Sequence, residues 1–319
     1  MRRIGILSNV HSRRNKGALP AIERMLGEFP DVVHQSFRHM NEMPQALAVL
    51  ARNRVAHLVI NGGDGTVQAV LGELLDRLPF ATRPRVTLIG GGTTNVIAHD
   101  VGTPDAPIDA LGRILRRARR GDAGETMRRT TIAVKFSGRE RTEYGFVAGA
   151  VGFYQGTRLT QREIHSVGLR HTLATKAGIL WSVMRLLWHG EGDRSGLRGE
   201  RVAIGLNGSP PHEAPYLFIL ATTLERLLPG VMPFWGHGHG AIRLTTIASP
   251  AQRFGRAFIS VVRGQPRPWM HHAGYASTRA DRIALRLTSP IVVDGEVFDP
   301  GPHGHVELSA GPVVEFHRY

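Results

Sequence analysis

VAHLVINGGDGTVQAVLGELLDRL, residues 55–78, is the stretch of sequence that decides the fold. The apolar run at 57–61 fits a strand that is covered on both faces of a parallel sheet. Apolar side chains then recur at helical spacing through 67–78, with Thr66 placed as the helix cap and Pro79 as its stop. The pattern predicts a strand, a glycine turn and a helix in immediate succession.

The turn itself reads Gly62-Gly63-Asp64-Gly65-Thr66. It brings backbone N–H groups to the positive end of a helix dipole, which is a place that attracts phosphate. Glycines suit such a turn because no Cβ keeps a ligand away and because the chain can take a positive φ. Asp64 could hold a magnesium ion or receive a proton.

The same alternation of strand and helix runs through the first third of the chain. Strands are expected at 4–9, 32–37, 57–61 and 86–89, and a second glycine turn, Gly90 to Asn95, follows the last of them. The order predicts a parallel, doubly wound α/β sheet whose ligand crevice lies at the carboxyl ends of the strands. Neither turn matches the Walker A or the GxGxxG pattern.

Composition narrows the class of protein. The 319 residues suggest two domains, and there is no cysteine for a disulfide, a thiol nucleophile or a cysteine-held zinc. The net charge of +14 favours anionic partners, namely nucleotide phosphates, acidic lipid head groups or nucleic acid. No signal peptide and no membrane-spanning run is evident, so we expect a cytoplasmic protein.

The pattern changes near residues 127–145, where closely spaced strands begin. We expect an α/β domain at 1–128, an antiparallel β-sandwich at 129–305 and a terminal segment at 306–319. Expected strands lie at 129–136, 143–150, 201–206, 216–222, 242–247, 282–287 and 291–293.

One amphipathic segment, Leu169 to His189, stands apart from these strands. Its apolar stripe suits either contact with a membrane or the lining of a lipid tunnel. An ordinary helix that covers the sandwich explains the same stripe equally well.

Four motifs together resemble the diacylglycerol kinase catalytic-domain family, which includes bacterial lipid kinases and sphingosine and ceramide kinases. They are the loop Ser8 to Asn15, the turn Gly62 to Thr66, the turn Gly91 to Asn95, and Asp294-Gly295-Glu296. The resemblance is close over residues 1–102 and looser over the rest of the chain. It implies a β-sandwich as the second domain and a final segment that returns to the first.

The resemblance also implies roles for individual residues. It makes Glu296 the proton acceptor, with Asp294 beside it in the same site, whereas sphingosine-kinase-like schemes give the role of base to Asp64. Phosphoryl transfer also needs magnesium, and we expect Asp64 to bind it directly or through water. We expect Asp64 and Glu296 to face one cleft between the domains. Residues expected to contact ATP are Asn9, Ser12, Gly62, Gly63, Asp64, Gly65, Thr66, Val67, Gly92, Thr93 and Asn95.

The sequence departs from the family pattern at two places that concern polar contacts and metal binding. Val96 stands where an aspartate usually follows the second turn, so any polar contact of that aspartate is lost or supplied elsewhere. Gly238-His239-Gly240 stands near an Asp-Asp-Gly turn that helps to hold a structural magnesium in bacterial members. We therefore assign no metal ligands there.

The sequence thus predicts an ATP- and Mg²⁺-dependent lipid kinase that transfers the γ-phosphate to a lipid alcohol. Diacylglycerol is the first choice of acceptor, with ceramide or a sphingoid base as alternatives. Arginines would hold the enzyme on an anionic membrane surface as a peripheral protein. The sequence leaves open whether the protein forms a homodimer. Rival interpretations are an NAD kinase-like enzyme and a non-catalytic nucleotide- or lipid-binding protein; no nucleic-acid-reading motif is present.

Overall fold

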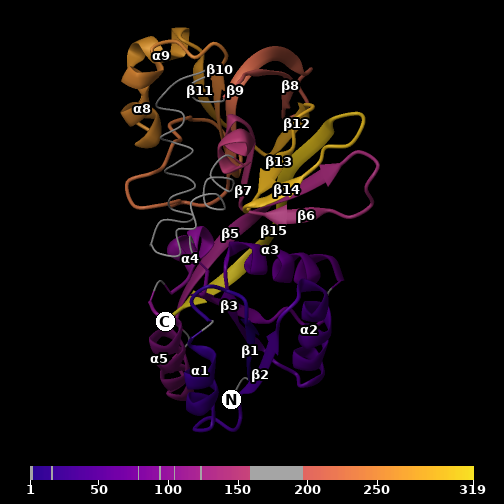
Figure 1. Cartoon of the computed structure of the whole chain (residues 1–319), viewed down its shortest axis with the longest axis vertical. Helices are drawn as coiled ribbons and strands as arrows, with labels where there is room; N and C mark the ends of the chain where they lie inside the picture. Colours follow the sequence, from indigo (N-terminus) through magenta and orange to yellow (C-terminus); the bar gives the residue numbers. More distant parts are fainter. Residues whose placement is uncertain are drawn as a thin grey trace. The chain divides into compact units, whose positions relative to one another are not determined.

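The computed structural model describes residues 3–15, 17–77, 79–92, 95–103, 105–122, 124–158 and 197–319 (Figure 1). The chain forms two compact units. The first comprises Met1–Arg129 and Val313–Tyr319, and the second comprises Thr130–Pro312. The segment Leu169 to His189 lies outside the described residues.

A parallel sheet is the centre of the first unit. Its strands are β1 (Ile4–Asn9), β2 (Val33–Phe37), β3 (His57–Gly62) and β4 (Arg85–Gly90), in the order β2-β1-β3-β4. The end of β15 (His305–Arg318) adds to β4 in parallel, with Phe316 opposite Val86. β3 is buried along its whole length, as its continuous apolar pattern predicts.

Helices cover both faces of this sheet. They are α1 (Leu19–Leu26), α2 (Met43–Arg52), α3 (Asp64–Gly72), α4 (Val96–Val101) and α5 (Pro107–Arg119), with a 3-10 turn at Met40–Glu42 before α2. α1 and α5 pack against each other over one hydrophobic cluster that includes Ile22, Val59 and Leu111. The doubly wound α/β arrangement predicted from the sequence is confirmed.

The helix after the first glycine turn differs from its prediction at both ends. It begins at Asp64 with Gly63 as its N-cap, so the expected capping role of Thr66 is wrong. Thr66 lies inside the helix and its hydroxyl accepts a hydrogen bond from the Asn9 side chain instead. At the other end, α3 continues directly into a π-helical turn, Glu73–Arg77.

The second unit is built from antiparallel strands. They are the second-unit parts of β5 (Glu125–Phe136) and of β15, together with β6 (Glu143–Gly145), β7 (Val147–Val151), β8 (Glu200–Leu206), β9 (His212–Thr222), β10 (Ile242–Ala248), β11 (Tyr275–Ala280), β12 (Arg282–Arg286), β13 (Ile291–Val293) and β14 (Glu296–Phe298). Two helices follow β10, namely α8 (Phe254–Val262) and α9 (Pro268–His272).

Strand β9 pairs with three other strands. Its first part pairs with β8, its last part pairs with β7, and its other edge pairs with β10. Side chains of these strands and of β12 share one hydrophobic core, for example Val202 of β8, Ala148 of β7 and Ile283 of β12. The antiparallel character of this region agrees with the sequence prediction. The expected strand 143–150 is two strands, separated at Phe146.

Candidate functional site

The two glycine turns of the first unit pack directly against each other. A Cβ built on Gly92 would lie 2.5 Å from the Gly63 Cα atom, and one on Gly63 would lie 3.2 Å from the Gly92 Cα atom. Neither Gly62 nor Gly63 has a positive φ, so the expectation of left-handed backbone is wrong at these positions. Gly63 and Gly92 are required because their backbones meet, whereas a Cβ on Gly62 would lie 2.6 Å from the Thr66 side chain.

Asp64 connects the two turns through its side chain. It is the first residue of α3 and is buried, with 5% of its surface exposed. Its Oδ1 atom accepts a hydrogen bond of 3.1 Å from the backbone N–H of Ile97, in the first turn of α4. The carboxylate therefore lies at the N-terminal ends of two helices, where the dipoles favour negative charge.

Asn95 closes the second turn on itself. Its Oδ1 atom accepts from the Gly92 N–H at 2.8 Å and its Nδ2 atom donates to the Gly92 carbonyl at 3.0 Å. The residue takes the left-handed conformation, with φ of 52°. Asn95 thus shapes the turn. Thr93 lies outside the described residues, and its predicted contact with ATP stays a prediction.

The loop after β1 carries a third part of the site. Asn9 donates from Nδ2 to the Thr66 hydroxyl at 2.8 Å, and Ser12 is buried with 8% exposed. The backbone N–H of Arg14 donates to the Gly91 carbonyl. The predicted residues Asn9, Thr66 and Gly92 thus belong to one hydrogen-bonded region at the carboxyl ends of β1, β3 and β4.

Two buried asparagines were not predicted as site residues. Asn15 donates from Nδ2 to the carbonyls of Asn9 and Asn61, at 2.9 and 3.2 Å. The Oδ1 atoms of Asn15 and Asn61 are buried, and within the described parts of the chain they accept no hydrogen bond. Buried polar atoms normally have a partner. The available signal for Asn61 was a polar residue at the end of an otherwise apolar strand.

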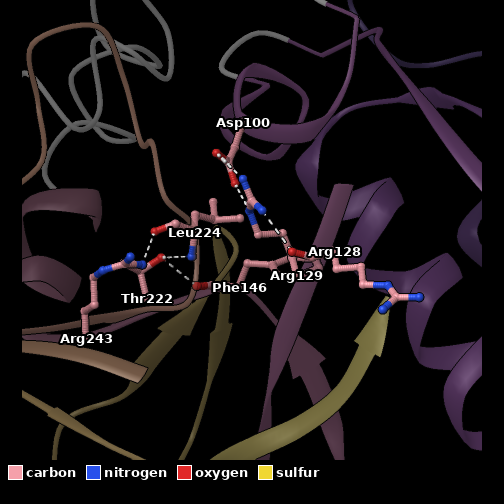
Figure 2. Close-up of polar contacts among 7 residues, drawn as sticks. All are labelled: Asp100, Arg128, Arg129, Phe146, Thr222, Leu224 and Arg243. Carbon is pink, nitrogen blue, oxygen red and sulfur yellow. Dashed lines mark hydrogen bonds and ion pairs between the residues drawn. The ribbon is translucent and has the colours of Figure 1, made fainter. Parts of the chain in front are cut away.

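A buried ion pair braces the helix behind the second turn. Arg129 donates from Nε to Asp100 Oδ2 at 2.7 Å and from a terminal nitrogen to Oδ1 at 3.3 Å. Figure 2 shows the guanidinium turned onto this carboxylate, while Arg128 extends the other way. Asp100 belongs to α4, so the pair ties β5 to the helix that follows Asn95.

In the second unit, Asp294-Gly295 forms the turn of the β13–β14 hairpin. Both residues have a positive φ, 46° and 94°, as a two-residue hairpin turn with Asp-Gly requires. Asp294 is buried, and its carboxylate accepts from the backbone N–H groups of Phe146 and Val147 at 2.8 to 3.1 Å. Asp294 therefore fixes the hairpin to the break between β6 and β7.

A second set of hydrogen bonds, drawn in Figure 2, holds the residue between β6 and β7. The Phe146 carbonyl accepts from the Thr222 hydroxyl at 2.8 Å, and that hydroxyl accepts from the Leu224 N–H at 3.1 Å. Arg243 donates to the Leu224 carbonyl. Glu296 differs from Asp294, because its side chain is exposed and makes no hydrogen bond or ion pair with the described residues.

His34, near the start of β2, is a partly buried histidine whose side chain reaches β1. Burial lowers the pKa of His34 below its usual 6.5, and the nearby Glu23 opposes this only partly. His34 contacts the Ser8 hydroxyl at 3.1 Å through Nε2. Within the described part of the chain, no three acidic or histidine side chains gather as a metal-binding group. The assignment of Asp64 as a metal ligand stays a prediction from the sequence.

Comparison with known proteins gives a family match for the first part of the chain. Residues 4–126 match the model of the diacylglycerol kinase catalytic domain. These residues, which make up less than half of the chain, resemble that family. The match includes the loop after β1, both glycine turns and the helices α3 to α5.

The individual proteins that the chain matches are distant. "Probable lipid kinase YegS-like" of Chromohalobacter salexigens is 37% identical over 71 residues, which span 22% of this chain and 22% of that protein. A solved diacylglycerol kinase from Bacillus anthracis strain Sterne matches with a TM-score of 0.60 and 14% identity, over 98% of this chain and 96% of that one. Yeast NADH kinase complexed with NADH matches with a TM-score of 0.51 and 11% identity, over 100% of this chain and 82% of that one. Likeness at such identities shows the fold alone.

In the part of the chain that the structure describes, no helix has the length and hydropathy needed to cross a bilayer.

Proposed function

We propose that the protein is an ATP-dependent lipid kinase that phosphorylates the hydroxyl of a lipid alcohol, with diacylglycerol as the first candidate. The observation that carries the proposal is the contact between Gly63 and Gly92 in a chain whose residues 4–126 match a diacylglycerol kinase catalytic domain. A Cβ at either position would fill the place where the two turns meet.

The first unit's residues fit a triphosphate. The first intrahelical bond of α3 runs from the Val67 N–H to the Gly63 carbonyl, so the N–H groups of Gly65 and Thr66 precede it. Such N–H groups at a helix N-terminus bind phosphate oxygens. Asn9 supports them by holding the Thr66 hydroxyl. We assign the phosphates of the donor to these groups and to the second turn.

Asp64 is assigned to the magnesium that accompanies ATP. Nucleotide-bound Mg²⁺ takes one or two protein carboxylates, with phosphate oxygens and water as its other ligands. One carboxylate held at two helix N-termini meets that need. When bound, ATP and Mg²⁺ supply the transferable phosphoryl group and the cation that spreads its charge.

Glu296 is assigned as the base that accepts the proton of the acceptor alcohol. Its exposed carboxylate is available to a substrate, whereas the carboxylate of Asp294 is occupied by backbone N–H groups. Asp294 is therefore assigned the task of holding the hairpin that presents Glu296. Arginines on a chain of net charge +14 support attachment to an anionic membrane.

A panel of acceptors tests the proposal. The protein is incubated with γ-labelled ATP and Mg²⁺ together with vesicles of diacylglycerol, ceramide or a sphingoid base, and separately with NAD. We expect labelled product with one of the lipids and none with NAD. Labelled NADP would favour the NAD kinase-like alternative, and absence of any product would favour the non-catalytic alternative.

A further inference from the structure

The first unit contains a cavity that the proposed function does not use. Its volume is about 440 Å³, within the range of roughly 300 to 1,000 Å³ that is usual for small-molecule sites. Its walls come from the end of α3, the π-helical turn, β4, β5 and the last part of β15. All of these residues belong to the first unit.

The cavity is separate from the glycine turns. Leu71, which lines it, is eight residues along α3 from the N-cap Gly63. At 1.5 Å per residue this is about 12 Å along the helix axis. A molecule in the cavity therefore contacts the end of α3 opposite to the end assigned to the phosphates.

Its inner surface is aliphatic. Leu71, Leu74, Val86 and Val314 line it and are themselves buried, with 1 to 7% of their surface exposed. Val313, by contrast, is 50% exposed. Leu74 belongs to the π-helical turn, and such turns often occur at functional sites. A wall of this kind accepts an alkyl chain and gives a bare phosphate ion nothing to bind.

The charged residues of the cavity are predominantly cationic. Arg83, Arg85 and Arg128 line it, against the single carboxylate of Glu315. Arg128 already binds Glu315 at 2.6 Å. Arg83 is exposed and makes no hydrogen bond or ion pair with any described residue. Its planar guanidinium can therefore bind a carboxylate or a phosphate group.

From these observations we infer that the cavity binds a lipid-borne anion, namely one alkyl chain that carries a carboxylate or phosphate head group. The chain lies against the aliphatic wall and the head group binds Arg83. This site is distinct from the proposed site of phosphoryl transfer and does not depend on that function.

Calorimetric titration of the full chain with oleate, below the concentration at which oleate forms micelles, tests the inference. We expect saturable binding of one oleate. Oleyl alcohol, which lacks the charge, and inorganic phosphate, which lacks the chain, should each bind at least roughly fivefold more weakly, as expected when one half of a paired recognition is removed. Equal binding of either compound would overturn the inference.

Two variants locate the binding. Arg83→Glu should weaken oleate roughly fivefold or more, since an attraction becomes a repulsion. Val313→Trp should weaken it by filling the cavity at its most exposed aliphatic residue, which leaves the buried wall unchanged. Arg52→Glu is the matched control, because Arg52 is exposed in the last turn of α2 and does not line the cavity.

The controls separate this site from general attraction to a basic protein. If Arg52→Glu weakens oleate as much as Arg83→Glu does, or if Val313→Trp leaves binding unchanged, the inference is wrong. Asp64→Asn should bind oleate like the unmodified protein. Failure of the proposed kinase activity would therefore leave this result standing, and the reverse also holds.

Discussion

At the scale of single residues, the first unit depends on buried polar side chains that hold backbone in place. Asp64 binds the start of α4, Asn95 closes its own turn, and Arg129 pairs with Asp100. Each of these side chains is buried, so loss of one of its hydrogen bonds is expected to cost stability.

The Arg129–Asp100 pair gives the clearest stability prediction. Arg129→Met should lower the free energy of unfolding by roughly 3 to 5 kcal/mol, because the buried charge of Asp100 would lose the opposite charge of the guanidinium. The double variant Arg129→Met, Asp100→Leu should recover much of that loss. Urea denaturation measures both values.

Arg128 provides the matched control for this pair. It neighbours Arg129, but its side chain is 73% exposed and its pair with Glu315 is solvated. Arg128→Met should therefore cost about 1 kcal/mol or less. If Arg128→Met and Arg129→Met cost the same, the buried pair does not have the importance assigned to it.

His34 gives a prediction about pH. Because burial lowers its pKa in the folded state, the unfolded chain binds this proton more readily. His34 thus contributes to a loss of stability as the pH falls below about 6.5, and full stability is present above that value. His34→Gln should flatten the dependence of the urea midpoint on pH between about pH 7 and pH 5.5. An unchanged slope would refute this assignment.

At the scale of elements, the strand-turn-helix units were largely predictable and their internal contacts were not. The buried run 57–61 and the helical spacing after it identified β3 and α3. The cap at Gly63 and the π-helical turn depend on tertiary packing, which periodicity does not report. The role of Asn95 was equally hidden, because a left-handed asparagine and a ligand-binding asparagine look alike in a sequence.

The second unit shows the same limit. The strand at 291–293 was predicted to the residue, and Asp-Gly after it is a strong hairpin signal. Burial of Asp294 against Phe146 joins positions 148 residues apart, which local pattern cannot reveal. The strand β11 and the helix α8 were not predicted.

The contact between the glycine turns gives a prediction at this scale. Gly92→Ala should weaken ATP binding at least tenfold and destabilise the protein by roughly 1 to 3 kcal/mol, because the new methyl group would meet the Gly63 backbone. Gly17→Ala is the control, since a Cβ there meets nothing within 4 Å. Nucleotide titration and urea denaturation measure the two effects. Equal behaviour of the two variants would argue against close packing of the turns.

At the scale of the whole molecule, charge is the dominant property. The 40 lysine and arginine residues exceed the 26 acidic residues, and this imbalance was read correctly from composition alone. Composition alone could not decide whether the anionic partner is a nucleotide, a lipid or a nucleic acid. The glycine turns and the family match of residues 4–126 favour the first two.

Salt should therefore control attachment to membranes. Co-sedimentation with vesicles that contain anionic lipid should fall as salt rises from about 0.1 M to about 1 M, because the Debye length shrinks from about 10 Å to about 3 Å. Vesicles of zwitterionic lipid should bind weakly throughout. Attachment that is indifferent to salt would contradict an electrostatic hold.

The central claim is the proposal that this chain transfers phosphate to a lipid alcohol and needs both Asp64 and Glu296 to do so. The most direct test is the rate of transfer of labelled γ-phosphate to diacylglycerol in vesicles by the unmodified protein, Asp64→Asn, Glu296→Gln and the exposed control Glu28→Gln. We predict transfer by the unmodified protein and the control, and a loss of at least roughly a hundredfold in each of the other two. Transfer that survives both substitutions at the full rate would contradict the account.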